Sequence, residues 1–569
     1  MKRKVTITCI CLLSTLMLVR HQVWATVRLP AVFGDHMVLQ RNVKVPVWGW
    51  AKPGEQVQII FKGKLFKTQA GTDGKWALKI NKYSAGGPYE MTIKDGDGQL
   101  IVKDILIGDV WVTSGQSNME FGIQNEEHGA DAIAKATDSL IHFFFVPFAS
   151  ALQPQDDIVK QSADSPNGKW VVCSPQLMAD PKWAWHGFSA AGYYFAQQIR
   201  KTTGAPVGMI GTYKGGTAAQ AWMSLAALQQ KPEFSAYVSK YETLVAHYEE
   251  VKVAYPQLQA NYQQALKQWN TEVGDNYAIA LKQWEAAAAL TKAAGDPTPM
   301  RPKPSRPAPQ NPAPPDGGFN SPTNLYNAMI MPILHYGIKG VIWYQGESNG
   351  DRLNDAVLYK DLFPGMITDW RNNWGQGNFP FLFVQLANYH APAVSPSEGN
   401  WPWVRDAQLK TLSLPQTGMA VITDIGNADN IHPTNKLDVG LRLSLIARHM
   451  VYGESLVYSG PVLRSMKTEG NKIRLTFNDT GSGLAVGRNA RDAGIALKGF
   501  GIAGADQKFV WATAVIEGNT VVVSSSEVTD PVAVRYNWAD NPPGDLYNKE
   551  SLPAGPFRTD SWAPPLNAK

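Results

Sequence analysis

The stretch that decides the fold is Gly108-Asp109-Val110-Trp111-Val112-Thr113-Ser114-Gly115-Gln116-Ser117-Asn118-Met119. Residues 105–113 are mostly β-branched or apolar and predict a buried strand, and a turn of small residues that carries Ser117 follows at once. Open α/β sheets place their chemistry beyond the carboxyl ends of their strands. Ser117 is therefore a candidate nucleophile, and a serine in that role needs a base for its proton and donors for an oxyanion.

The region from residue 105 to residue 453 alternates apolar segments with amphipathic ones. Segments typical of buried strands occur at 141–146, 207–211, 341–345, 381–385 and 419–424. Amphipathic helices are predicted at 188–201, 354–370 and 435–452. Apolar strands separated by helices are typical of a parallel sheet that is covered on both faces. We therefore predict an α/β catalytic core in this region.

The chain on either side of this core has the sequence pattern of β-domains. Residues 26–104 alternate apolar and polar positions, with turn signals such as Lys52-Pro53-Gly54 between the runs. The alternation returns in residues 454–569, where turn residues bound the run Val521-Val522-Val523. The 569 residues also exceed what one hydrophobic core usually supports. We expect a β-sandwich-like domain at each end of the core.

A helical and Pro-rich insertion, residues 232–316, interrupts the core. Its first part carries an aromatic residue at every seventh position, at Tyr241, Tyr248, Tyr255, Tyr262 and Trp269. This heptad predicts two helices that break near Gly274-Asp275 and pack as an antiparallel hairpin, with a kink at Pro256. Residues 297–315 alternate prolines with basic and polar residues and predict an extended linker. Two roles stay open: a spacer or lid edge, and an arm that grips sugar through its aromatic residues.

The first 25 residues have the pattern of a secretory signal peptide. A basic start precedes the apolar run 5–19, and Val23-Trp24-Ala25 is a plausible cleavage site. The run is shorter than the roughly 20 residues that a membrane-spanning helix needs. We expect export, to the periplasm or beyond the cell, with no membrane span. Two of the three cysteines leave with this segment, so Cys173 remains alone and no intramolecular disulfide is expected.

The charge balance gives no support for a nucleic-acid partner. Of the 53 basic residues four lie in the predicted signal, so 49 remain against 48 acidic residues. A nucleic-acid-binding protein would need a clustered basic face, and this near-neutral balance gives no support for one. A hydrophobic fraction of 44% indicates folded domains rather than disorder.

A base for Ser117 is predicted in the stretch Asp429-Asn430-Ile431-His432, which follows the last predicted strand of the core. An imidazole acts as general base when a neighbouring group holds it in one tautomer, and Asp429 can do this from within one tight loop. Asp424, at the end of that strand, is the rival for the orienting role. Whether Asp429 is essential or the site works as a Ser117–His432 dyad stays open.

Three groups are candidates for the oxyanion donors. The backbone N–H of Ser117 is one, the turn Gly215-Gly216 offers a second without a Cβ in the way, and the side-chain amide of Gln345 is the third. Which of the two glycines donates stays open. Glu347 is interpreted as a structural residue that holds Gln345 by a hydrogen bond, although it could also orient a base.

These blocks carry a resemblance to a known family. Gly115-Gln116-Ser117-Asn118-Met119, Gly215-Gly216-Thr217, Gln345-Gly346-Glu347-Ser348-Asn349 and Asp429-x-x-His432 stand in the order of the four motif blocks of the SGNH (GDSL-like) hydrolases, in their carbohydrate acetylesterase variant. The chain is similar to bacterial sialate O-acetylesterases in three further stretches, 29–41, 338–347 and 552–560. The resemblance covers nearly all of the chain after the signal except the insertion. Gln116 and Gln345 depart from the Asp and Asn of the wider family, as is usual in the sugar-esterase branch.

The resemblance implies an SGNH-type three-layer αβα core and a role for each matching residue. Ser117 would be the nucleophile, His432 the base and Asp429 its orienter, while Ser117, one of Gly215 and Gly216, and Gln345 would bind the oxyanion. The supporting residues would be Gln116, Asn118 and Glu347.

The function implied is removal of O-acetyl groups from sialic acid through an acetyl-enzyme, with no metal or organic cofactor. An esterase for acetylated xylan or another polysaccharide is the alternative within the class. A non-catalytic carbohydrate-binding protein is the alternative from another class, and a lipase or peptidase on the same fold is a third. The sugar, the ester position, the oligomeric state and the role of the insertion are not determined by the sequence.

Overall fold

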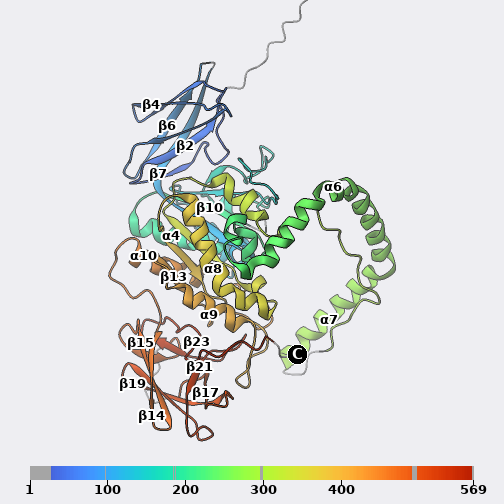
Figure 1. Ribbon diagram of the computed structural model, residues 1–569, viewed down its shortest axis with the longest axis vertical. Coiled ribbons are helices and arrows are strands. Elements are labelled where there is room, and N and C mark those ends of the chain that lie inside the picture. The colour runs from blue at the N-terminus through green and yellow to red at the C-terminus, as the bar shows by residue number, and fades with distance from the viewer. Residues whose placement is uncertain are drawn as a thin grey trace, which may run out of the picture.

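The computed structural model of the protein describes residues 27–96, 98–183, 185, 187–294, 299–489 and 496–566. The predicted signal peptide, residues 1–25, lies outside the described residues. An N-terminal β-domain, an α/β core and a C-terminal β-domain follow one another along the longest axis, and a long curved helix stands to one side of the core (Figure 1).

The core is built on a mainly parallel sheet. Its strand order is β13 (Thr417–Ala420), β12 (Phe381–Val384), β11 (Gly340–Tyr344), β7 (Gln99–Gly115), β10 (Val207–Tyr213), β8 (Ile141–Phe145) and β9 (Trp170–Val172). All neighbours from β13 to β8 are parallel, and only β9 runs antiparallel to β8. The carboxyl ends of the parallel strands therefore meet at one edge. The last predicted strand, 419–424, ends in the structure at Ala420, and the residues after it form a loop.

Helices cover both faces of this sheet. Helices α4 (Ala190–Thr203) and α10 (Leu437–Met450) share one buried apolar cluster with the sheet, and α8 (Leu353–Trp374) and α9 (Trp401–Thr411) share the cluster on the opposite face. Successive strand residues, such as Val341 and Ile342, point into different clusters, as the pleat requires. The core thus has a helix–sheet–helix layering, which is consistent with the SGNH type of fold.

The N-terminal β-domain is continuous with the core through β7. The first part of this strand pairs with β6 (Gly86–Lys94) and β1 (Val38–Gln40), and the last part pairs with β10 and β11. The side chains of residues 99–104 are largely exposed, whereas those of 105–115 are all buried. The domain boundary predicted at residue 104 therefore lies inside one strand, without a linker. The domain also contains β2 (Val45–Trp50), β3 (Gln56–Phe61), β4 (Lys64–Gln69) and β5 (Lys75–Ile80).

The C-terminal β-domain consists of two four-stranded sheets and a short pair. One sheet has the order β14 (Val462–Glu469), β15 (Lys472–Asn478), β20 (Thr520–Ser524), β19 (Thr513–Glu517). The other has the order β18 (Val510–Trp511), β17 (Phe500–Ala503), β21 (Ala533–Tyr536), β23 (Phe557–Arg558), and the pair is β16 (Leu484–Val486) with β22 (Leu546–Asn548). Apolar side chains from both sheets form one buried cluster, as in a sandwich.

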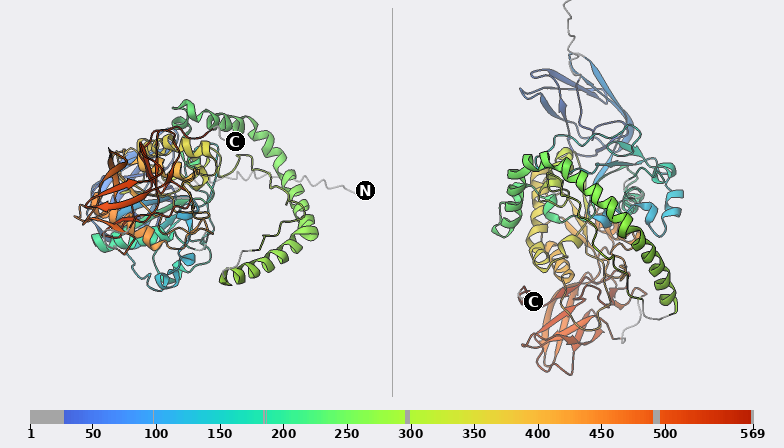
Figure 2. Two further views of the ribbon diagram at one scale, coloured as in Figure 1. Left: turned by 90° about the horizontal axis from the view of Figure 1, so that it is seen from below. Right: turned by 90° about the vertical axis from the view of Figure 1, so that its right-hand side faces the viewer.

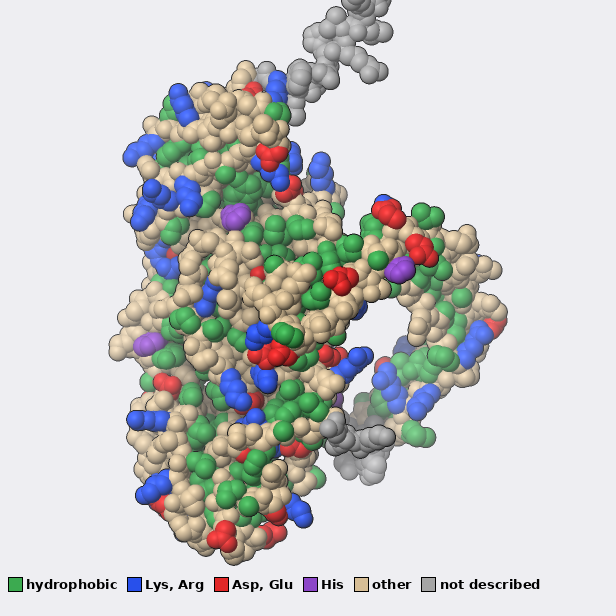
Figure 3. Space-filling model, in the orientation of Figure 1, with side chains coloured by type: hydrophobic (Ala, Val, Ile, Leu, Met, Phe, Trp, Pro, Cys, Tyr) green, Lys and Arg blue, Asp and Glu red, His purple; other side chains and the backbone are tan. Residues whose placement is uncertain are grey.

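The insertion is one curved helix and not a hairpin of two. Helix α6 (Ser235–Trp269), a π-helical turn (Asn270–Gly274) and α7 (Asp275–Ala294) follow without a reversal, and Pro256 lies inside α6 without ending it. The helix arches away from the core and crosses in front of one of its faces (Figure 2). In the space-filling view an opening remains between the arch and the body (Figure 3).

The partner of the helix is the Pro-rich segment, which returns along it. Trp284 Nε1 donates to Pro299 O at 2.7 Å, and Trp269 Nε1 donates to Arg306 O at 3.0 Å. The predicted hairpin is therefore wrong, because a heptad stripe shows that a helix has a packing face but not what covers it. The chain that follows the insertion is tied beside the Gly215-Gly216 turn, where Ala218 N donates to Asn320 Oδ1 at 2.9 Å and Thr323 N donates to Gln220 O at 3.0 Å.

Short helices complete the described chain. They are α1 (Ser117–Glu120), η1 (Ile123–Asn125), α2 (Gly129–Ala134), α3 (Pro175–Met178), η2 (Ala219–Trp222), α5 (Leu225–Leu228), η3 (Pro232–Phe234), η5 (Tyr326–Ile330), η6 (Met331–Ile333) and η7 (Glu347–Asn349). Among the helices of the described ranges, none is both long enough and apolar enough to cross a membrane.

Candidate active site

Ser117 begins helix α1 directly beyond the carboxyl end of β7. Gly115 ends the strand with a φ of 137°, and a Cβ there would lie 2.1 Å from Tyr344 O, so only glycine fits where β7 passes β11. Gln116 N then donates to the same carbonyl at 3.0 Å. This tight contact turns the chain and leaves the Ser117 side chain half-buried at the sheet edge.

His432 reaches Ser117 from the loop between β13 and α10. Its Nε2 lies 2.9 Å from Ser117 Oγ, although 315 positions separate the two residues. Two short turns order this loop: Asp429 N donates to Asn427 Oδ1, and His432 N donates to Asn430 Oδ1, both at 2.9 Å. The Trp185 ring meets the imidazole edge-on, with the ring centroids 5.0 Å apart.

The pKa of His432 is lowered, first by burial and then by the positive charge of Lys436. A lowered pKa keeps the imidazole neutral at neutral pH, and a neutral imidazole can accept the proton of a serine hydroxyl. The pair is therefore arranged for general-base activation of Ser117.

The two carboxylates considered as orienters have different surroundings. Asp424 forms a buried, two-pronged ion pair with Arg442, with N–O distances of 2.6 and 2.7 Å. Its carboxylate is thereby held away from an orienting role at His432. Asp429 lies exposed in the loop of His432 itself, three residues before it.

The predicted oxyanion donors lie around Ser117, and two of them, Gly215 N and Gln345 Nε2, already donate to acceptors within the protein. A Cβ on Gly215 would lie 3.3 Å from Ser117 Cβ, so this glycine is adjacent to the nucleophile. Its N–H donates to Glu120 Oε2 at 2.5 Å. Gly216, by contrast, is exposed and would place a Cβ in open space, with a φ of 71°.

Gln345 is fully buried behind these residues. Its Nε2 donates to Asn349 Oδ1 at 2.7 Å and to Thr217 O at 3.3 Å, and its Oε1 accepts from Tyr359 Oη at 2.9 Å. The bond to Thr217 is longer than most N–H···O bonds, so this hydrogen costs least to redirect. If Gln345 serves as an oxyanion donor, that is the hydrogen it would supply.

Gln116 and Asn118, the neighbours of Ser117, tie it to the other blocks. Gln116 Oε1 accepts from Ser348 N at 3.2 Å and from Gly346 N at 3.4 Å, which fixes the turn after β11 against the turn after β7. Asn118 Nδ2 donates to Glu347 Oε1 at 2.6 Å and to Ile431 O at 2.9 Å, next to His432. Glu347 thus holds Asn118, and not Gln345 as expected, and it retains a structural place.

Lys436 completes a buried network behind the Ser117–His432 pair. Its Nζ donates to Asn118 Oδ1 and to Pro433 O, both at 2.7 Å, and the side chain has no exposed surface. Burial lowers the pKa of Lys436 to about 7, although the Glu347 carboxylate raises it. Burial likewise raises the pKa of Glu347. Asn118 therefore stands between a buried cation and a buried carboxylate.

Sequence reasoning missed Lys436, Glu120 and Tyr359. A lysine just before an amphipathic helix has the same pattern as a solvent-exposed one, and Glu120 looks like an ordinary acidic residue in the first turn of a helix. Their positions depend on the meeting of separate loops, for which a single sequence carries no signal.

The chain is similar to known proteins over most of its length. The family model described as carbohydrate esterase, sialic acid-specific acetylesterase matches residues 107–289 and 316–449. The chain is 26% identical over 481 residues to the sialate O-acetylesterase of Mus musculus, which covers 79% of each chain. It is 25% identical over 572 residues to that of Rattus norvegicus, which covers 93% of this chain and 94% of the relative.

A solved structure gives a further match. The crystal structure of a novel carbohydrate acetylesterase from Xanthomonas citri is 37% identical, with a TM-score of 0.72, and the match covers 94% of this chain and 100% of that one. The range matched by the family model includes α6 and most of α7. The resemblance therefore extends into the insertion, which was expected to lie outside it.

Proposed function

The chain belongs to the carbohydrate esterase family of sialic acid-specific acetylesterases, and from this premise we propose that it is an exported serine esterase that removes O-acetyl groups from carbohydrate through an acetyl-enzyme. Membership of the family makes it a carboxylic ester hydrolase. The observation that carries the serine mechanism is the 2.9 Å contact between Ser117 Oγ and His432 Nε2.

In the first half-reaction, Ser117 Oγ attacks the acetyl carbonyl carbon while its proton passes to His432 Nε2. The carbonyl oxygen becomes an oxyanion, which the N–H of Ser117, a donor from the Gly215-Gly216 turn and the Gln345 amide would stabilise. When this intermediate collapses, the bond between the acetyl carbon and the sugar oxygen breaks. The imidazolium then protonates the sugar oxygen, and the acetyl group stays on Ser117.

In the second half-reaction, water attacks the acetyl-enzyme and gives a proton to His432. Collapse of the second tetrahedral intermediate breaks the bond to Ser117 Oγ, which takes that proton back, and acetate leaves. His432 serves as base and then as acid in each half, so its lowered pKa suits a reaction run at neutral pH. Neither half-reaction requires a metal ion or an organic cofactor.

The sugar that carries the acetyl group is inferred from the activities of the relatives. The mouse and rat relatives are sialate O-acetylesterases, and this supports sialic acid esters as the substrate. The structural relative is named only as a carbohydrate acetylesterase, and at 37% identity it is more similar than the mammalian enzymes. That observation keeps acetylated xylan or another polysaccharide as the second candidate.

The deciding experiment is acetate release by the chain from residue 26 onward. O-acetylated sialoglycan and acetylated xylo-oligosaccharide are supplied in parallel, and the Ser117→Ala variant is run beside the parent. Release that disappears in the variant is the expected result, and the preferred substrate identifies the sugar. A folded parent that releases no acetate from either substrate or from an aryl acetate would instead favour a carbohydrate-binding protein. Sequencing of the exported protein should find Thr26 at its amino terminus.

A further inference from the structure

A small cavity lies between the loop that joins β12 to α9 and the C-terminal β-domain. Its volume is about 160 Å³, and its lining includes Glu398, Gly501, Phe509, Trp511, Arg535 and Trp538. It shares no residue with the candidate active site. Ligand pockets for drug-sized molecules have about 300–1,000 Å³, so this cavity has room for one small ring.

Strand register explains why the cavity exists. Gly501 on β17 is paired with Trp511 on β18 and with Arg535 on β21. Directly paired residues of antiparallel strands project on the same face. The missing side chain of Gly501 therefore leaves a gap between two large ones. Gly501 has no positive φ, and a Cβ there would lie 3.5 Å from Phe509 and 3.6 Å from Pro396, so neither backbone nor space demands glycine.

Fixed aromatic side chains form much of the wall. Trp511 keeps 37% of its surface exposed, yet its Nε1 donates to Val394 O at 2.9 Å, which holds the indole in place. Trp538 Nε1 donates to Glu398 Oε2 at 3.1 Å. A rigid, partly exposed indole loses little entropy on binding, and its electron-rich face attracts the polarised C–H groups of a sugar ring.

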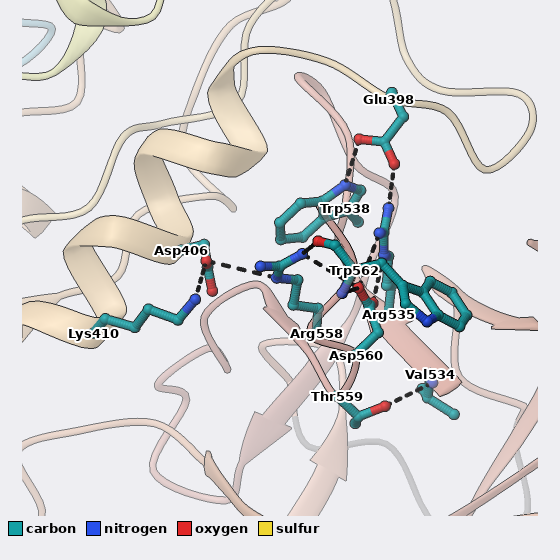
Figure 4. A network of polar contacts seen from close by, with 10 residues as sticks. All are labelled: Glu398, Asp406, Lys410, Val534, Arg535, Trp538, Arg558, Thr559, Asp560 and Trp562. Carbon is teal, nitrogen blue, oxygen red and sulfur yellow. Dashed lines mark hydrogen bonds and ion pairs between the residues drawn. The ribbon is translucent and has the colours of Figure 1, made fainter. Parts of the chain in front are cut away.

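The charges around the cavity are balanced (Figure 4). Arg535 is paired with Glu398 and also with Asp560, where its Nε lies 2.8 Å from Oδ2. Beyond them, Arg558 lies between Asp560 and Asp406, and Lys410 Nζ donates to Asp406 at 2.6 Å. Within this network three cations thus face three carboxylates.

Glu398 is the polar group that a ligand can still reach. Its side chain is 43% exposed, and a carboxylate that accepts one bond from Arg535 and one from Trp538 keeps lone pairs for further donors. Hydroxyl groups are such donors, whereas a second carboxylate near Glu398 would be repelled. The wall therefore combines an apolar platform with an acceptor for hydroxyls.

We propose that this cavity is a non-catalytic subsite for one neutral sugar ring, stacked on Trp511 with its hydroxyls toward Glu398. The inference rests on the proposed function only in taking carbohydrate as the ligand, and it does not depend on acyl transfer. The neutral ring could belong to an acetylated polysaccharide or to the neutral sugars that carry a sialic acid. The sialic acid itself does not fit, because its carboxylate would meet Glu398.

Binding to the full chain with Ser117→Ala tests the proposal without turnover. Xylohexaose, cellohexaose, lactose and sialyl-lactose are titrated by calorimetry and by tryptophan fluorescence. At least one neutral oligosaccharide should bind. Gly501→Val fills the cavity and Trp511→Ala removes its platform, and each should weaken that binding at least tenfold. Trp511→Phe should keep most of it. Trp50→Ala, a change of a tryptophan in the N-terminal β-domain, is the matched control and should have no effect.

The results separate the two sources and can overturn the proposal. Binding of xylohexaose or cellohexaose indicates a polysaccharide, and binding of lactose with or without sialic acid indicates the neutral part of a glycan. Unchanged affinity in folded Gly501→Val and Trp511→Ala would overturn the subsite, as would the absence of any neutral ligand. Binding to this cavity that requires the sialic acid would overturn its neutral specificity. With Ser117 intact, Gly501→Val should hydrolyse an aryl acetate as the parent does, so failure of the subsite is distinct from failure of the esterase.

Discussion

The Ser117–His432 pair and the Lys436–Asn118–Glu347 network behind it meet at adjacent residues but differ in their surroundings. The pair is half-buried and neutral, and one contact of 2.9 Å joins its two members. The network is buried and charged, and Asn118 connects its cation to its carboxylate through bonds of 2.7 and 2.6 Å. A half-buried neutral pair can be changed at little cost in stability, whereas a buried charge needs its partner.

This difference suggests separate roles for the two groups of residues, one in the reaction and one in holding the fold. The pair would carry the reaction and contribute little to folding. The network contributes to folding and places Asn118, which holds the backbone next to His432 through Ile431 O. Variants on the two sides should therefore have different signatures in activity and in stability.

The largest effect on activity is expected from changes in the Ser117–His432 pair. Ser117→Ala and His432→Ala should each lower kcat/KM for an aryl acetate by about 10⁴-fold or more, because each removes an atom that makes or transfers a bond. Neither should change the free energy of unfolding by more than about 1 kcal/mol, since few packing contacts are lost. Stopped-assay kinetics and urea unfolding measure the two quantities. A variant that keeps a tenth of the parent activity would end the serine mechanism.

In the buried network, Lys436→Met should destabilise the protein by about 3–5 kcal/mol. The Glu347 carboxylate loses the cation near it, and Asn118 Oδ1 and Pro433 O lose their hydrogen-bond donor. The same variant should change the pH dependence. Burial and Lys436 lower the pKa of His432, so kcat/KM of the parent should fall only when the pH drops below 6.5. Without the lysine the acid limb should move up toward 6.5.

The control for Lys436→Met is the double variant Lys436→Met/Glu347→Gln. It removes both charges, so it should regain most of the lost stability while the acid limb stays displaced. Urea unfolding at pH 7 and a pH profile of kcat/KM between pH 5 and pH 8 check both statements. An acid limb that does not move in either variant would show that Lys436 has no electrostatic effect on His432.

The same contrast limits what the sequence could predict. The strands of the core were predicted because apolar runs such as 207–211 and 341–345 report burial directly, and the family was recognised from short blocks at their ends. Lys436 was missed, because burial of a charged side chain depends on loops that meet only in the fold. The gap at Gly501 was missed for a similar reason, since it depends on which residues β18 and β21 place beside it.

The insertion was predicted as a helical segment but with the wrong partner. The heptad of aromatic residues indicated a packing stripe, and its last member, Trp269, donates to the Pro-rich segment, whereas its first, Tyr241, donates to Leu152 O. Proline cannot donate a backbone hydrogen bond, so the segment instead accepts from tryptophans of the helix through its carbonyls. Periodicity reports the face of a helix, and it does not report what lies against that face.

Variants of Gln345 test whether this residue takes part in the reaction, like the Ser117–His432 pair, or only supports the fold, like the buried network. If its amide turns from Thr217 O to the oxyanion, Gln345→Ala should lower kcat by about 100- to 1,000-fold with little change in KM. Tyr359→Phe is the matched control, because it removes the hydroxyl that holds Gln345 Oε1 and keeps the amide. Its loss should be smaller. A loss of less than tenfold in Gln345→Ala, together with lower stability, would assign Gln345 to the supporting side.

Among the residues of the Ser117–His432 pair and its surroundings, the smallest effect on kcat/KM is expected at Asp429. Its carboxylate is exposed, and water screens an exposed charge, so its hold on the imidazole should be weaker than that of a buried carboxylate. Asp429→Asn should therefore cost far less kcat/KM than His432→Ala, which is the behaviour of a Ser117–His432 dyad. Both variants are compared with the parent on one aryl acetate at pH 7 and pH 8. Equal losses would mean that Asp429 fixes the tautomer of His432. Ser117, His432 and Asp429 would then form a full triad whose third member is an exposed carboxylate.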